Sequence, residues 1–308
     1  MPIDRQPQIA VANRASLNKT LEWFFGPGGH LGRNFPTQTL SVDELACDGL
    51  LEARRDGRLV GAILYVIQPG KTALLWPPRI VKGEPSTTSD RLIDMAERQL
   101  SEAGISMAHV VLPAIDERDD HLLRSHDYFA LAPVLYLAST VRDLPISRPE
   151  TLLEFEPYES SNHERLAHLV EASYEQTRDC PRLGGVRTVE EVLDGYRQSG
   201  EFNSRHWLIV RHRGKDVGVL ILTDHPADQC CELVYMGLTL SSRGHGWGKQ
   251  IARHAQWLTL RAGNDQLVLA VDSENDPAVS VYTSVGFHVW DRRTVYVKLL
   301  RPDSSGKK

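Results

Sequence analysis

Two stretches of the chain repeat each other at a nearly constant spacing, and this limits the folds that are possible. "ARRDGRLVGAIL" (53–64) aligns with "VRHRGKDVGVLI" (210–221), an offset of 210 − 53 = 157 residues. "LLRSHDYF" (122–129) aligns with "VYTSVGFH" (281–288), an offset of 281 − 122 = 159. Two matches in the same order at almost one spacing indicate a tandem repeat of a single domain type.

The repeat and the length of 308 residues together predict two domains. The first pair of matching stretches has two apolar runs around a charged turn with glycine, which is typical of a β-hairpin. Prolines and charges interrupt the apolar runs in "VRDLPISRPE" (141–150), so we expect the seam there. The expected domains are 1–145 and 146–308.

Composition excludes several classes of protein. With 41% hydrophobic and 24% charged residues the chain is typical of a soluble globular protein, and a net charge of −5 without a Lys/Arg block gives no support to a nucleic-acid partner. Neither an apolar signal core nor a membrane-length apolar run of about 18 residues is found. Cys47, Cys180, Cys230 and Cys231 form no C-x-x-C or disulfide-like pattern. We therefore expect a cytoplasmic protein that has no membrane partner, and no metal.

A glycine-rich junction stands out in the second half. "SSRGHGWGKQIARHA" (241–255) follows an apolar run typical of a buried strand and leads into apolar residues at helical spacing. Gly244, Gly246 and Gly248 lack Cβ atoms, so a bulky ligand can approach the main chain there. Unpaired N–H groups at the start of a helix form a site for a phosphate group. An ordinary tight turn is the alternative interpretation.

Two other phosphate-binding patterns do not fit this junction. A Walker A loop requires a hydroxyl residue after its lysine, but Gln250 follows Lys249. A dinucleotide fingerprint requires G-x-G-x-x-G, whereas the spacing here is G-x-G-x-G.

The order of elements in the second half predicts a mixed α/β layout. "TLLEFEPY" (151–158) is typical of a strand, and apolar residues at helical spacing predict a helix over 166–174. Thr188 and Glu191 form the pattern of a capping box at the start of a second helix. These are followed by a hairpin, the strand before the glycines, the helix after them and the strand "LVLAV". A short last helix has Asp276 as its expected N-cap, and "VYVKLL" closes the sheet.

With these motifs the second half resembles the GCN5-related N-acetyltransferase (GNAT) family over residues 151–300. The family's acyl-CoA loop, R/Q-x-x-G-x-G/A, is matched by Arg243, Gly246 and Gly248. The family's N-x-x-A-x-x-x-Y-x-x-x-G-F is matched in full by "NDPAVSVYTSVGF" (275–287). The resemblance implies an α/β (mixed α+β) fold of two tandem GNAT-like domains, each a mostly antiparallel mixed sheet flanked by helices.

The resemblance also implies acetyl-CoA as cosubstrate. The amides from Gly244 to Lys249 would cradle the pyrophosphate, while Leu238 and Leu240 would contact the pantetheine arm and Asn275 would orient it. The full set of residues expected to bind the cosubstrate is Leu238, Thr239, Leu240, Arg243, Gly244, His245, Gly246, Trp247, Gly248, Lys249 and Asn275. Arg243 could also be a solvated loop arginine, and Asn275 could be merely part of the turn before a helix.

Catalysis by acetyl transfer to an amine needs a proton donor for the departing thiolate and a base for the amine. Tyr282 occupies the position at which family members protonate the coenzyme A sulfur, although it also lies on an apolar helix stripe that would bury it for packing alone. Glu232 is the expected base, with an edge carboxylate as its structural alternative. A water molecule, His206 and His245 are the other possible bases.

The function that follows is transfer of an acetyl group to a primary amine by direct attack in a ternary complex. The acceptor would be a small molecule or a peptide, and residues 162–200 would shape its pocket. A non-catalytic acyl-CoA sensor is the alternative, which an intact Tyr282 argues against because a sensor has no need of a proton donor. Neither Cys230 nor Cys231 has an obvious histidine partner, so no covalent enzyme intermediate is expected.

The first half resembles the same fold without its cofactor loop. Pro77, Pro78 and Pro85 stand between the corresponding strand and helix, where they remove N–H groups that a phosphate would need. Leu123 and Asp127 align with Tyr282 and Gly286. We therefore expect residues 1–145 to be a degenerate GNAT-like domain. Tandem members of the family with one degenerate half, such as the mycothiol synthases, are similar in architecture.

Overall fold

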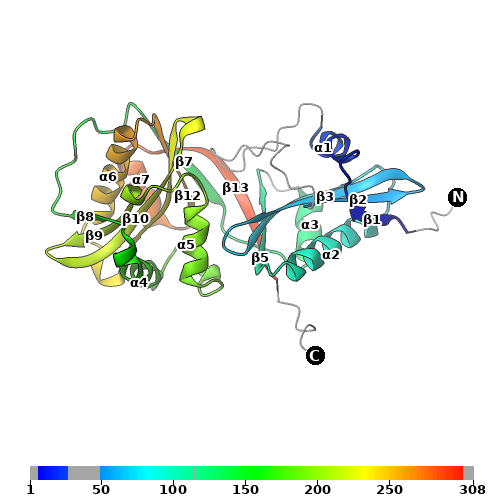
Figure 1. Ribbon diagram of the computed structural model, residues 1–308, viewed down its shortest axis with the longest axis horizontal. Helices are drawn as coiled ribbons and strands as arrows, with labels where there is room; N and C mark the ends of the chain where they lie inside the picture. Colours follow the sequence, from blue (N-terminus) through cyan, green and yellow to red (C-terminus); the bar gives the residue numbers. More distant parts are fainter. Residues whose placement is uncertain (1–5, 27–48, 114–115, 301–308) are drawn as a thin grey trace. The chain divides into compact units, whose positions relative to one another are not determined.

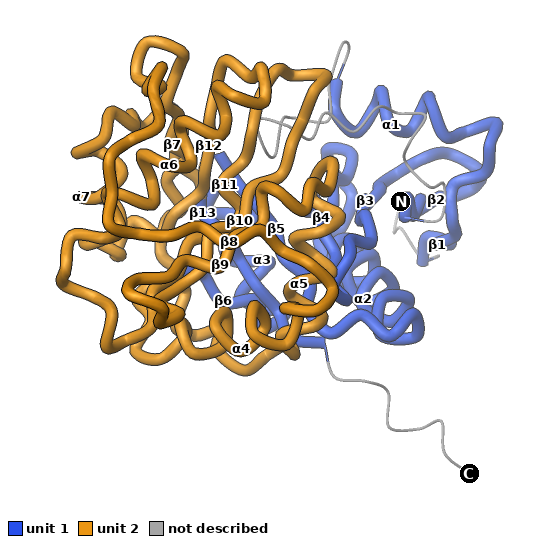
Figure 2. Tube along the Cα trace, turned by 60° about the vertical axis from the view of Figure 1, so that its left-hand side comes forward, with its two compact units in different colours: residues 1–131, 294–308 blue, residues 132–293 orange. Residues whose placement is uncertain are grey.

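A computed structural model describes residues 6–26, 49–113 and 116–300. The chain divides into two compact units (Figure 2). Unit 1 comprises Met1–Leu131 with Thr294–Lys308, and unit 2 comprises Ala132–Arg293. Cys47 lies outside the described residues.

Unit 1 is a mixed sheet with helices, coloured from blue to blue-green in Figure 1 except for its part of β13, which is red. Its strands follow the order β1-β2-β3-β4-β5-β13, with β6 also paired to β13, and every pair is antiparallel except β4–β5. The elements are β1 (Gln8–Val11), α1 (Leu17–Phe25), β2 (Leu50–Arg55), β3 (Arg58–Gln68), β4 (Thr72–Ile80), α2 (Thr87–Glu102), β5 (Met107–Leu112), α3 (Glu117–Ser125) and β6 (Phe129–Ala130).

Unit 2 repeats this plan. Its strands follow the order β13-β7-β12-β11-β10-β9-β8, and only β11–β12 is parallel. The elements are β7 (Val134–Thr140), β8 (Glu154–Pro157), α4 (His163–Ser173), α5 (Val189–Arg197), β9 (Trp207–His212), β10 (Lys215–His225), β11 (Cys230–Leu238), α6 (Trp247–Arg261), β12 (Gln266–Asp272), α7 (Asp276–Ser284) and β13 (His288–Leu299). The predicted fold class, two mostly antiparallel mixed sheets with flanking helices, is confirmed.

Alternate residues along the strands of unit 2 form two separate cores. Leu220 and Leu222 of β10 pack with α6 and α7 on one face, whereas Val219 and Ile221 pack with α4 and α5 on the other. Successive side chains of a strand point to opposite faces, so an unbroken apolar run is what a strand covered on both sides requires. Figure 1 shows the two helix pairs on opposite sides of the strands.

The repeat predicted from the hairpins is confirmed in atomic detail. Asp56 and Gly57 join β2 to β3 with φ of 51° and 77°, and Arg213 and Gly214 join β9 to β10 with φ of 50° and 76°. Two consecutive positive φ values define the tight hairpin turn that favours glycine at its second position. In both hairpins the arginine three residues before the glycine donates to the glycine carbonyl, at 3.0 Å and 3.1 Å.

The second match of the repeat is found at the ends of α3 and α7. Asp127 has φ of 62° and Gly286 has φ of 97°, so both chains leave the helix through the left-handed region. The next backbone N–H returns to the helix in each case, from Tyr128 to the carbonyl of Leu123 at 3.0 Å and from Phe287 to that of Tyr282 at 3.1 Å. This is a helix C-terminal cap used twice.

The last strand explains where the units divide. Residues 288–293 of β13 pair with β7 in unit 2, and residues 294–299 pair with β5 in unit 1. The first unit thus takes its closing strand from the end of the chain, and the strand that follows α3 and β6 joins unit 2. The compact units therefore differ from residues 1–145 and 146–308, which remain a prediction about the bounds of the repeat.

Two local expectations need correction. Asn275, and not Asp276, caps α7, because its side-chain Oδ1 accepts from the N–H of Ala278 at 3.3 Å. Pro77 and Pro78 lie inside β4, at a shift in its register with β3, and leave only Pro85 in the turn before α2. Prolines are tolerated at such an irregularity because the ladder hydrogen bond is already missing. No helix among the described residues is long and apolar enough to cross a bilayer.

Candidate functional site

The candidate site of unit 2 begins where two parallel strands part. β11 and β12 pair only over Cys230–Glu232 and Gln266–Val268, although both strands continue beyond this point. A shift in register against β10 leaves Val234 as an extra residue in β11 just after the divergence. Bulges of this kind redirect a strand and are frequent beside functional sites. The edge of β11 from residue 233 onward thus has no partner strand on the β12 side.

A cavity of about 470 Å³ fills this opening. Its wall combines β11 after the divergence, the end of β12, the turn before α6, the start of α7 and the segment after α4. Of the residues predicted from the sequence, the cavity is lined by Leu238, Arg243, Gly244, Gly246, Trp247, Gly248, Asn275 and Tyr282. The other four predicted residues are not among the lining residues: Thr239, Leu240 and His245 lie between β11 and α6, and Lys249 lies in the first turn of α6.

The glycine turn presents bare main chain to the cavity. Gly244 and Gly246 have φ of 81° and 75°, and a Cβ built on either would meet no atom within 4 Å. Other residues rarely adopt this conformation, so glycine is required by the backbone and the space beside it stays open. No described residue accepts a hydrogen bond from the N–H groups of residues 244–249. These groups lie at the positive end of α6, where they can bind an anion.

Gly248 has a different reason to be glycine. It is the second residue of α6, and a Cβ there would lie 3.3 Å from Cγ2 of Val281 in α7. The absent side chain lets α7 approach the start of α6, which brings Tyr282 to the cavity beside the glycine turn.

Arg243 stabilises the turn through hydrogen bonds to the main chain. Its guanidinium donates to three main-chain carbonyls, those of Leu238 at 3.2 Å, Gln176 at 3.1 Å and Ser173 at 2.8 Å. Ser173 is the last residue of α4, so the positive charge also lies at the negative end of that helix. The arginine therefore ties the glycine turn to the segment after α4.

Tyr282 combines burial with access to the cavity. Its side chain is 6% exposed and packs edge to face on Phe287, with ring centroids 5.5 Å apart. Burial raises the pKa of its hydroxyl, and the charge of Asp179 raises it further. The hydroxyl is therefore fully protonated near neutral pH, as a proton donor must be.

Glu232, the base predicted from the sequence, is the third residue of β11. It lies on the paired part of β11, its Oε2 is 3.3 Å from Nε2 of His225, and it is not among the residues that line the cavity. His206 and His245 do not line it either. The ring of His245 stacks on Trp247 at 4.7 Å, and Nδ1 of His206 lies 2.9 Å from a carboxylate oxygen of Asp224.

Asp179 lines the cavity, although the sequence did not predict it. It is the one carboxylate among the described residues that line the cavity. Its Oδ1 accepts from the N–H of Asp272, at the end of β12, at 3.3 Å. The surrounding protein desolvates the carboxylate and raises its pKa, although the side chain is accessible to solvent. Asp179 lies in the 162–200 region that was expected to shape the acceptor pocket, and no motif marks it.

Aromatic side chains complete the wall next to Asp179. The rings of Tyr174 and Tyr235 meet edge to face at 5.7 Å, and the hydroxyl of Tyr235 lies 2.6 Å from Oγ of Ser173. All three residues line the cavity. The cavity therefore has an N–H-rich end at the glycine turn and an aromatic, carboxylate-bearing wall after α4.

Comparisons with known proteins agree with this geometry. Residues 167–287 match the Acetyltransferase (GNAT) family. A mycothiol acetyltransferase of Corynebacterium efficiens is 33% identical over 72 residues, which are 23% of this chain and 24% of that protein. The chain thus spans about a quarter of the length of this curated relative.

Two solved structures have the same fold over almost the whole chain. A GCN5-related N-acetyltransferase from Sphaerobacter thermophilus has a TM-score of 0.61 at 16% identity, with 96% of each chain covered. A glucosamine N-acetyltransferase region of a fungal multi-domain β-N-acetylglucosaminidase has a TM-score of 0.60 at 15% identity, covering 95% of this chain and 38% of that one. The glycine turn and the diverging strands thus lie within residues 167–287, the part of the chain that matches the GNAT acetyltransferase family.

Proposed function

We propose that the chain is an N-acetyltransferase that uses acetyl-CoA and a primary amine bound together in the cavity of unit 2. The observation that carries this proposal is the convergence of three features on one cavity: the open N–H groups of the glycine turn, the hydroxyl of Tyr282 and the carboxylate of Asp179. A diphosphate needs the first, and transfer to an amine needs a proton donor and a proton acceptor.

The residues present fit acetyl-CoA. The turn from Gly244 to Lys249 would hold the diphosphate, because it offers N–H groups at a helix start and no side chain at the two positive-φ positions. The unpaired edge of β11, which includes Met236 and Leu238, would hold the amide groups of the pantetheine arm in place of a neighbouring strand. When bound, acetyl-CoA supplies a thioester whose carbonyl carbon is open to attack by an amine.

Residues of the chain would then accept the proton of the amine and donate a proton to the thiolate. The Asp179 carboxylate attracts the ammonium form of the acceptor and takes the proton that the amine must lose, which its raised pKa favours. The Tyr282 hydroxyl holds the proton that a departing thiolate needs. Glu232 remains the alternative base, and it would act through water because it does not line the cavity.

A thiol-release assay with the full chain tests the function over a panel of polyamines, amino sugars and peptides with free N-termini. We expect saturable release of coenzyme A that depends on at least one amine. Calorimetric binding of acetyl-CoA without release across the panel would favour the sensor function, and absence of binding would refute the proposal.

The base is tested by comparing Asp179→Asn with Glu232→Gln. If Asp179 is the base, kcat/KM of the wild type falls as pH drops through the raised pKa of this carboxylate, because only the deprotonated form accepts a proton. The Asp179→Asn protein should lose this acid limb and fall about 10²- to 10⁴-fold in kcat, while Glu232→Gln keeps the limb. The reverse result would assign the role to Glu232.

A further inference from the structure

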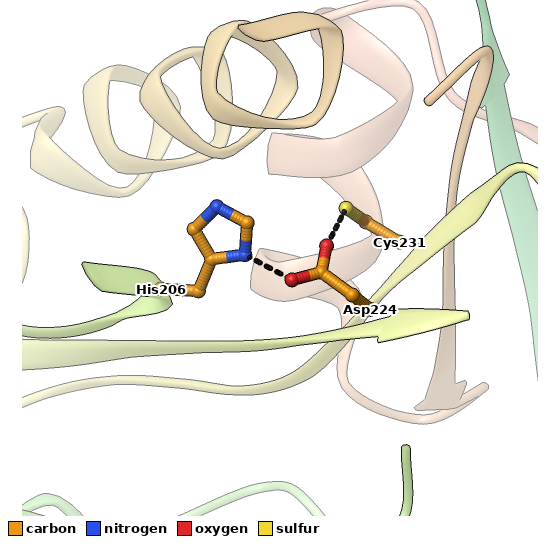
Figure 3. A group of neighbouring side chains, drawn as sticks. All are labelled: His206, Asp224 and Cys231. Carbon is orange, nitrogen blue, oxygen red and sulfur yellow. Dashed lines mark hydrogen bonds and ion pairs between the residues drawn. The ribbon is translucent and has the colours of Figure 1, made fainter. Parts of the chain in front are cut away.

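A second group of polar side chains lies in unit 2 away from the cavity described above. His206 ends a short 3₁₀ turn (Ser204–His206), Asp224 is near the end of β10, and Cys231 is near the start of β11. Figure 3 shows the imidazole and the thiol on either side of the carboxylate. Nδ1 of His206 is 2.9 Å from Oδ2 of Asp224, and Sγ of Cys231 is 3.1 Å from Oδ1.

His206 and Asp224 make a close polar contact, but its geometry is poor for a hydrogen bond. His206 is 5% exposed, and its buried Nδ1 makes no hydrogen bond of acceptable geometry even though a carboxylate oxygen is 2.9 Å away. Buried polar atoms are nearly always hydrogen-bonded, so an exception calls for an explanation. A cation bound by Nδ1 of His206 and Oδ2 of Asp224 would explain the contact. A nitrogen that binds a metal points its lone pair at the ion and does not donate an N–H to the neighbouring oxygen.

We propose that His206, Asp224 and Cys231 bind one divalent cation of the zinc type. Their three ligand atoms lie within 4.8 Å of one another, which a single ion can bridge with small side-chain movements. Imidazole, carboxylate and thiolate are the three ligand types of protein zinc sites, and the sulfur disfavours Mg²⁺ and Ca²⁺, which prefer oxygen.

The charges balance when the ion is bound. A neutral imidazole, a carboxylate and a thiolate together carry two negative charges, which a divalent cation neutralises inside a buried site. Without metal, Cys231 keeps its proton, because burial and its hydrogen bond to Asp224 raise the pKa of the thiol. Binding therefore breaks the S–H bond, forms a sulfur–metal bond and releases one proton to solvent.

The surroundings supply an outer shell and an entrance. Nδ2 of Asn264 is 3.1 Å from Sγ of Cys231, and Nδ2 of Asn203 is 3.5 Å from Oδ2 of Asp224. Such outer contacts orient metal ligands. His206, Asp224 and both asparagines also line a cavity of about 480 Å³, from which water could occupy a fourth coordination position. Because Cys231 lies in the paired segment just before β11 leaves β12, the ion would brace the strand that carries the cosubstrate cavity.

Cobalt and zinc binding to the chelator-treated full chain tests the site. We expect one equivalent of Co²⁺ to produce the absorption band of a thiolate–cobalt bond, and Zn²⁺ to displace it. Cys231→Ser should abolish the band and weaken Zn²⁺ binding at least about 100-fold in competition with a chromophoric chelator. Cys230→Ser is the matched control, because Cys230 is the adjacent buried thiol at 2% exposure and is not part of the cluster.

Two further results decide the matter if the serine variant folds poorly. His206→Gln leaves the thiolate in place, and we expect it to keep a thiolate–cobalt band while losing Zn²⁺ affinity by a similar factor. The proposal is wrong if the wild type shows no thiolate–cobalt band, if Cys230→Ser loses binding as much as Cys231→Ser, or if His206→Gln binds Zn²⁺ as tightly as the wild type.

Discussion

Replacing Tyr282 by phenylalanine removes one atom from the site and leaves the fold intact. The ring packs on Phe287 in a buried cluster, and its hydroxyl makes no hydrogen bond to another described residue. Loss of the hydroxyl therefore leaves no buried partner unsatisfied, and the free energy of unfolding should change by less than about 1 kcal/mol. If the hydroxyl protonates the leaving thiolate, kcat should fall about 10²- to 10⁴-fold, or about 3 to 5 kcal/mol in the activation barrier.

Tyr235→Phe is the matched control for this prediction. Tyr235 lines the same cavity, but its hydroxyl lies 2.6 Å from Oγ of Ser173, so its removal costs a hydrogen bond of about 1 kcal/mol in stability and should leave kcat within a few-fold. Steady-state release of coenzyme A gives kcat, and calorimetry gives the affinity for acetyl-CoA, which neither variant should change. Full turnover by the Tyr282→Phe protein, or an equal loss in both variants, would refute the acid role.

Three further perturbations test the turn and the core. Gly246→Val should abolish acetyl-CoA binding in calorimetry, because a branched side chain strains the φ of 75° by about 1 to 2 kcal/mol and fills the open space beside the N–H groups. Arg243→Lys should raise KM for acetyl-CoA more than it lowers kcat, because an ammonium cannot span the three carbonyls that the guanidinium joins. His254 stacks on Phe155 at 3.6 Å, and burial, with a smaller effect of Arg148, lowers its pKa from 6.5 to about 4. The folded protein keeps this imidazole neutral while the unfolded chain protonates it, so the wild type should lose up to about 3 kcal/mol of stability as pH falls from 6.5 to 4. Chemical denaturation should show that His254→Phe loses less over this range.

The parts of the structure that the sequence predicted are those encoded locally. Thr188 and Glu191 form the expected reciprocal cap of α5, with hydrogen bonds of 3.3 Å and 3.0 Å. Gly57 and Gly214 mark the same turn in both repeats, because a positive φ at that position selects glycine wherever the hairpin occurs. In such cases the conformation of a residue is determined by residues only a few positions away in the sequence.

The parts that the sequence did not predict depend on contacts between distant segments. The position of Asp179 depends on distant residues: Arg243, 64 positions further along (243 − 179 = 64), joins the segment after α4 to the turn before α6, and the N–H of Asp272 donates to the Asp179 carboxylate. The role of β13 in both units depends on which strand edge is free once the other strands have paired. Periodicity and capping patterns carry no information about either.

Unit 1 has the same fold as unit 2 but no counterpart of the glycine turn before its helix α2, and this difference indicates that the turn forms the candidate site. β4 and β5 pair in parallel only over Thr72–Leu74 and Met107–His109, so this unit also has strands that part. At the start of its helix, however, the N–H of Thr88 already donates to the carbonyl of Pro85, and the Glu84 carboxylate accepts from Thr88 Oγ1 at 2.6 Å. Burial acts to raise the pKa of Glu84, but hydrogen bonds from Arg55 and Thr88 outweigh it and hold the pKa below its usual value. A diphosphate would meet a carboxylate here in place of open N–H groups, so we expect one acetyl-CoA per chain, bound in unit 2.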